Sequence, residues 1–201
     1  MCSQWHILAA PIVLGLLLTA SPLMASTGSA SFSMVVSAGA ATCLPNASAT
    51  VKITPRGSVE VMDVTVQGLP PNTDFDFFVI QVPKAPFGVS WYQGDITTNK
   101  KGRGHQRFMG RFSIETFAVA PGSAAAPVVF TSPFPDASLN PPFNPIQMYH
   151  LGLWFNSSDD AQAAGCPATV TPFNGEHNAG IQVLNTSNFA DDQGPLRGVN
   201  P

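Results

Sequence analysis

Charged side chains are scarce in this sequence. Lys and Arg number 9 and Asp and Glu 12 among 201 residues, so 10% of the chain is charged against roughly 25% in average domains. The formal net charge is −3 at pH 7, which excludes nucleic acid as an obvious partner because phosphate backbones are held by basic surfaces. The surface must rely on Ser, Thr, Asn, Gln and Gly, a composition that favours a secreted protein.

The motifs of common hydrolases and metalloenzymes are also absent. The sequence has no Gly-x-Ser-x-Gly, no His-x-His and no His-Glu-x-x-His. Nucleophilic hydrolysis needs an activated Ser or Cys in a special turn, and zinc chemistry needs histidines at ligand spacing. We therefore predict no catalytic residue, no metal ligand set and no cofactor.

The N-terminus carries no charged residue before Lys52, and residues 7–18 are almost wholly apolar. This run is about 12 residues long, too short for the roughly 20 that span a bilayer. Ala25 provides the small residue that signal peptidase needs. We predict that residues 1–25 are a cleaved signal peptide, leaving no stable membrane span and a secreted, extracellular or cell-surface protein. The alternative is an uncleaved anchor, because no Lys or Arg precedes the apolar run.

Cysteine is rare as well. Cys2 leaves with the predicted signal, so that Cys43 and Cys166 remain. An even pair in an oxidising compartment predicts a disulfide. It would close a loop of about 120 residues, which the chain-entropy model values at roughly 4–5 kcal/mol.

Long helical periodicity is missing, and short apolar runs alternate instead with turn residues. The sequence contains 19 Pro and 17 Gly. The segments with strand character are 32–36, 51–53, 59–67, 75–82, 92–98, 107–115, 149–155 and 181–184. We predict an all-β, antiparallel β-sandwich of about eight or nine strands, formed by one domain over residues 26–187.

Other segments depart from regular strands. The neighbours Val61 and Met62 break the alternation of 59–67, which predicts a bulge. The segment 157–165 has capping residues, an Ala-rich centre and a terminal Gly, and predicts one short helix. Residues 132–145 hold five prolines and predict a long Pro-rich surface loop, and residues 188–201 predict a loose tail.

One short motif resembles a known family. The run Val66-Gln67-Gly68-Leu69-Pro70-Pro71-Asn72-Thr73-Asp74-Phe75 resembles the turn between two strands of fibronectin type III and related immunoglobulin-like domains, where a Leu plugs the core and Thr precedes an aromatic at the sheet corner. Phe75 stands where the family usually has Tyr, so the hydroxyl hydrogen bond of that corner is missing. The resemblance covers ten residues. It implies an immunoglobulin-like sandwich and no activity, because such folds host many functions.

The most suggestive functional feature is a basic cluster within residues 100–111. Its members are Lys100, Lys101, Arg103, Arg107 and Arg111, accompanied by His105. A strand period of two places most of them on one face of a hairpin. Such a stripe could bind an acidic polysaccharide, an envelope component or another protein. It could instead pair with the protein's own acidic half or protect an edge strand from aggregation.

Metal sites are weaker alternatives. Asn72, Asp74 and Asp76 are spaced like the ligands of a calcium loop, but no Gly and no distant Glu complete such a loop. A copper site would use Cys166 and His177, at the expense of the disulfide. We therefore expect a non-enzymatic secreted or surface-associated protein with a binding or structural role, and the alternative is a metal-dependent or otherwise unrecognised secreted enzyme that uses His150 or His177.

Overall fold

The structure is a computed structural model that describes residues 28–118 and 146–200. The predicted signal peptide and the predicted Pro-rich loop at 132–145 lie outside the described residues. No helix in the described ranges is long and apolar enough to cross a membrane.

The regular secondary structure of the described residues is mainly β-strand, as predicted, although the arrangement of the strands does not confirm the predicted immunoglobulin-like sandwich. Its elements are β1 (Ala30–Val36), β2 (Ser48–Arg56), β3 (Val59–Gln67), β4 (Asp74–Ile80), β5 (Ser90–Thr97), β6 (Gly104–Gly110), β7 (Phe117–Ala118), β8 (Ile146–Gln147), β9 (His150–Phe155), α1 (Ser158–Ala163), β10 (Gln182–Asn185) and the 3-10 helix η2 (Pro195–Gly198). Apart from the two-residue pair β7–β8, all of these strands belong to one sheet.

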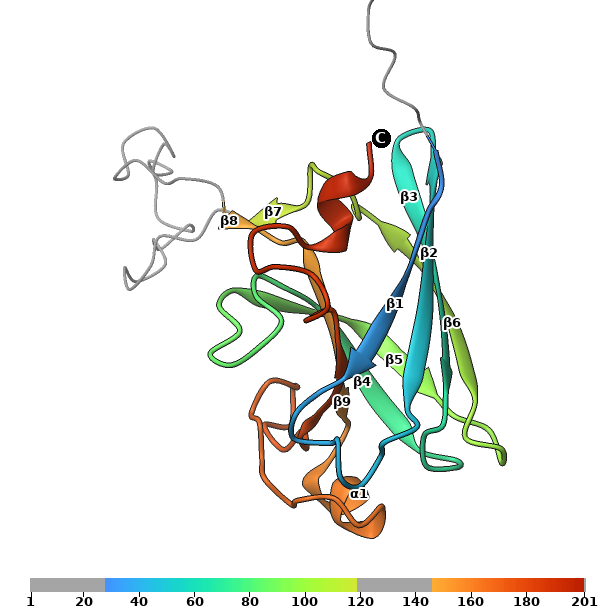
Figure 1. Cartoon of the computed structure of the whole chain (residues 1–201), viewed down its shortest axis with the longest axis vertical. Helices are drawn as coiled ribbons and strands as arrows, with labels where there is room; N and C mark the ends of the chain where they lie inside the picture. The colour runs from blue at the N-terminus through green and yellow to red at the C-terminus, as the bar shows by residue number, and fades with distance from the viewer. Residues whose placement is uncertain (1–27, 119–145, 201) are drawn as a thin grey trace, which may run out of the picture.

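That sheet is antiparallel and has eight strands in the order β5-β4-β9-β10-β1-β2-β3-β6. It curls until its two ends, β5 and β6, approach each other, so the sheet is nearly closed into a barrel (Figure 1). A Cβ on Gly94 of β5 would lie 2.9 Å from the ring of Phe108 on β6, which shows how closely the two ends pack. Strand β1 joins the two halves, because it pairs with β2 through residues 30–34 and with β10 through residues 35–36.

Strand alternation follows the predicted pattern, with one correction. Met62, Val64 and the other inward residues of β3 are fully buried. The predicted bulge at Val61–Met62 is wrong, since the pairing of β3 with β2 and β6 runs without a shift there. The alternation is kept because Glu60 points inward, where its carboxylate accepts the backbone N–H of Phe112 at 2.7 Å.

The predicted disulfide between Cys43 and Cys166 is confirmed, with a Cα–Cα distance of 5.3 Å. It ties the loop between β1 and β2 to the end of α1. The predicted helix is also present. The Ser157 side chain caps it by accepting the Asp160 N–H at 3.0 Å, and Gly165 follows its end with a φ of 74°.

The C-terminal segment packs against the barrel, unlike the loose tail predicted for it. Leu196 and Val199 are fully buried, and η2 covers the barrel end opposite α1 (Figure 1). The backbone N–H of Ile114 donates to the carbonyl of Val199 at 2.9 Å. Strand β6 ends at Gly110, so Ile114 lies beyond it and the strand predicted over 107–115 ends earlier than expected.

Candidate functional site

The basic cluster lies on the turn between β5 and β6 and along β6, and Asn99 fixes this turn. The predicted hairpin is not formed, because β5 and β6 are the two ends of the sheet and do not pair with each other. The Asn99 side-chain oxygen accepts the backbone N–H groups of Lys101 at 2.8 Å and Arg103 at 3.3 Å. Lys100, Lys101 and Arg103 are exposed, and none of the three forms an ion pair within the described part of the chain. We call these three residues the β5–β6 tip.

The rest of the cluster is engaged by carboxylates of β3. Arg107 and His105 lie 2.8 Å and 3.3 Å from the same oxygen of Asp63. The hydrogen bond from Arg107 lowers the pKa of Asp63, so this carboxylate is charged at neutral pH. Arg111 lies 3.7 Å from the buried Glu60. The stripe therefore divides into an unpaired tip and a part that is neutralised within the fold.

The histidines named for the alternative enzyme have different surroundings. His150 is fully buried, with Nδ1 2.9 Å from the Thr186 hydroxyl and Nε2 3.1 Å from the Asp191 carbonyl. Nε2 must donate to that carbonyl, so Nδ1 accepts from Thr186. Burial lowers the pKa of His150, which favours this neutral form. His177 lies exposed in a turn.

The metal alternatives gain no support from the geometry. Cys166 is bonded to Cys43, so the copper alternative is wrong. The candidate calcium ligands lie in different environments. Asp74 is exposed and accepts the Thr97 hydroxyl at 2.5 Å, whereas Asp76 is buried. Residues 28–118 and 146–200 contain no group of three or more His, Cys, Asp or Glu side chains that could hold a metal ion.

A hydrophobic cluster that the sequence did not reveal covers the outer face of β4 and β9. Four aromatic rings, those of Phe78, Phe87, Trp154 and Phe173, pack with centroids 5.2–5.9 Å apart. Strand β4 is therefore buried on both faces: Phe77 faces the barrel interior and Phe78 faces this aromatic cluster.

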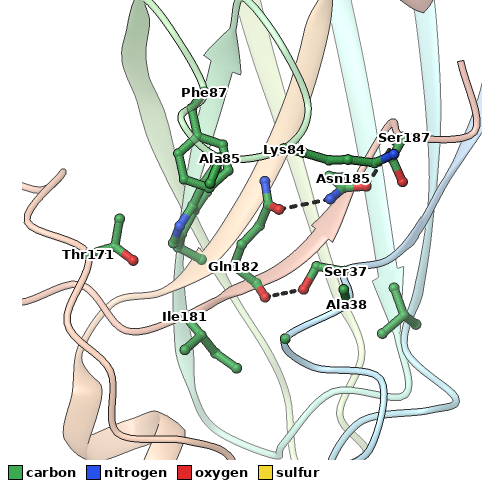
Figure 2. Close-up of a pocket in the computed structure, with 13 residues that line it drawn as sticks. Ser37, Ala38, Lys84, Ala85, Phe87, Thr171, Ile181, Gln182, Asn185 and Ser187 are labelled. Atoms are coloured by element: carbon green, nitrogen blue, oxygen red, sulfur yellow. Dashed lines mark hydrogen bonds between the residues drawn. The ribbon is translucent and has the colours of Figure 1, made fainter. Parts of the chain in front are cut away.

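A pocket of about 580 Å³ opens beside the aromatic cluster (Figure 2). It lies between the end of β1, the β4–β5 loop and β10, and we call it the Lys84 pocket. Its lining residues include Val36, Ser37, Lys84, Phe87, Trp154 and Gln182. Apolar groups form much of the wall, and Figure 2 shows the Lys84 side chain extended toward Ser187.

The polar side chains in the wall of the Lys84 pocket are hydrogen-bonded to one another and to the backbone. The Gln182 side chain donates to the Pro83 carbonyl at 3.2 Å and accepts from Asn185 at 2.8 Å. Asn185 in turn accepts the Ser187 N–H at 3.0 Å, and the Ser37 hydroxyl donates to the Gln182 carbonyl (Figure 2). These groups hold each other in place, which fixes the shape of the wall.

Two donors of the pocket remain without partners. The indole N–H of Trp154 is buried and makes no hydrogen bond within the described residues. The Lys84 ammonium forms no ion pair there either. An unpartnered buried donor costs about 1–3 kcal/mol, so the Trp154 N–H favours an accepting group, and the exposed Lys84 ammonium favours an anionic one.

Sequence reasoning missed this pocket because its residues come from distant segments. Lys84 sits in a Pro-Lys-Ala-Pro loop, and Gln182 follows nearly a hundred residues later. The only local indication that the loop packs against other residues was the apolar character of Val82 and Phe87 on either side of it. No protein-family model matches the chain, and no curated protein matches it.

Proposed function

We propose that this protein is a non-enzymatic, extracytoplasmic binding protein whose Lys84 pocket holds a small amphiphilic anion. The carrying observation is an unpaired ammonium placed over a largely apolar pocket. The ligand's anionic head would meet Lys84, and its apolar body would lie against Phe87, Trp154 and Ile181. A volume of about 580 Å³ suits a molecule of metabolite size.

Calorimetric titration with octanoate tests this proposal, and octanol is the uncharged analogue of the same length. The Lys84→Gln variant should bind octanoate at least about tenfold more weakly, because a charge-assisted hydrogen bond contributes roughly 1.5–3 kcal/mol. Its affinity for octanol should not change. Lys52→Gln is the matched control, since Lys52 is exposed on β2, away from the pocket.

Two results would contradict the pocket proposal. The first is equal octanoate binding by wild type and the Lys84→Gln variant, and the second is equal binding of octanoate and octanol by the wild type. Failure of all three proteins to bind octanoate would reject an amphiphilic anion as the ligand class.

The β5–β6 tip supports a second candidate function, contact with an anionic polymer. Lys100, Lys101 and Arg103 place three unpaired cations on a turn that Asn99 holds in one shape. Their joint reversal to Glu should elute the protein from a heparin column at clearly lower salt, because fewer counterions are then released. Reversal of Lys52 and Arg56, two exposed residues of β2, is the control. Equal elution of both variants would reject this role.

A further inference from the structure

A second pocket, of opposite charge, lies on the outer face of β4 and β5. Its volume is about 240 Å³, and it is lined by Asp76, Tyr92, Asp95, Asn156, Asn174, Gly175 and Glu176. We call it the acidic pocket. Three carboxyl groups and no Lys or Arg line it.

Asp76 forms the buried part of the acidic pocket. The residue is 1% exposed, and its Oδ2 atom has no hydrogen-bond partner within the described residues. It pairs in register with Asp95 on β5 and with Trp154 on β9. A carboxylate oxygen buried without a donor is costly, so this atom is poised to accept a hydrogen bond from something that enters the pocket.

The mouth of the pocket is organised by Tyr92. Its hydroxyl donates to Asp95 Oδ1 at 2.7 Å, which orients that carboxylate. The Tyr92 ring is 50% exposed and packs edge-on against Phe78 with centroids 5.8 Å apart. An aromatic face beside carboxylates is the environment that organic cations prefer, through cation–π attraction combined with ion pairing.

We infer that the acidic pocket binds the ammonium group of a small organic amine. The N–H donors of the ammonium would reach the free Oδ2 of Asp76 and the carboxylate of Asp95, and the alkyl chain would lie against Tyr92. An ammonium group carries three donors and needs few acceptors, whereas calcium takes six to eight oxygens. No metal-holding group of acidic side chains exists among the residues that the structure describes. This site is separate from the Lys84 pocket and shares no lining residue with it.

Calorimetry with n-butylamine at pH 8 tests the inference, and n-butanol serves as the uncharged analogue. We expect one butylamine per chain for the wild type. Asp76→Asn should lower the affinity at least about tenfold, because it removes a charge-assisted acceptor. Asp74→Asn is the matched control, since Asp74 lies on the same strand two residues away, exposed and outside the pocket. Its affinity should equal that of the wild type.

Asp76→Asn should fold, because an amide relieves the repulsion between Asp76 and Asp95, and a melting curve checks this. Asp95→Asn is a second variant that should also weaken butylamine binding. The inference is overturned if the wild type does not bind butylamine, if butanol binds as well, or if both Asp76→Asn and Asp95→Asn bind butylamine like the wild type. Tighter binding of calcium chloride than of butylamine would also overturn it, in favour of a metal. Lys84→Gln should bind butylamine normally, which separates this test from that of the Lys84 pocket.

Discussion

The buried carboxyl of Asp76 has a shifted pKa because of the residues that surround it in the fold. Burial and the neighbouring charge of Asp95 raise the pKa of Asp76 to about 7. The other groups that face it are Tyr92 on β5, Asn174 and Glu176 on the loop before β10, and Trp154 on β9. None of them is a cation. The Asn174 amide favours the charged form, but burial and the charge of Asp95 outweigh it.

This pKa predicts how stability changes with pH. Between about pH 4 and pH 7 the unfolded chain has lost the Asp76 proton while the native chain retains it. The free energy of unfolding should therefore fall as pH rises through this window, by at most about 1.4 kcal/mol per pH unit. Asp76→Asn should flatten this slope, so that the variant gains stability over the wild type at pH 8 but not at pH 4. Urea denaturation at both pH values measures the difference, and a parallel pH dependence of the two proteins would contradict it.

At the scale of elements, the helix α1 is held by its cap. It has only six residues, too few to be stable without tertiary contacts. Ser157→Ala should cost about 1 kcal/mol, because the Asp160 N–H loses its acceptor. Ser158→Ala, one position further on, is the control and should cost much less. Thermal melts of the two variants give the comparison, and equal losses would show that the cap does not matter.

The elements were more predictable from the sequence than the pockets were. Alternation identified the long strands because their inward residues are apolar. It misplaced a bulge at Val61–Met62 because Glu60, a charged residue, occupies an inward position and is stabilised by the distant Phe112 N–H. The strands β7 and β8 have two residues each, too few for any alternation to be visible.

The candidate sites depend on contacts that join segments far apart in the chain. A period of two placed His105 and Arg107 on one face, but nothing local could show that Asp63 of β3 lies opposite and neutralises them. From the sequence, Asp76 was interpreted as one candidate ligand of a calcium loop. Its actual neighbour is Asp95 of β5, set by the strand register.

At the scale of the whole molecule, the C-terminal segment closes one end of the barrel. Leu196 is fully buried, and its N–H donates to the Tyr149 carbonyl at 3.2 Å. Leu196→Ala should cost about 2–5 kcal/mol, the range for truncating a buried Leu. Arg197→Ala, at the exposed neighbour, should cost far less. Equal melting temperatures for the two variants would mean that the segment contributes nothing to stability.

The disulfide secures the other end, where the β1–β2 loop meets α1. Cys43 and Cys166 are 123 residues apart, so the bond removes a large set of conformations from the unfolded chain. Replacing both by Ala should lower the free energy of unfolding by roughly 2–5 kcal/mol. Denaturation of the wild type under reducing conditions should reproduce the midpoint of the double variant. If the double variant instead matched the oxidised wild type, then packing of β10 against β1 and β9 would by itself hold this end of the barrel closed.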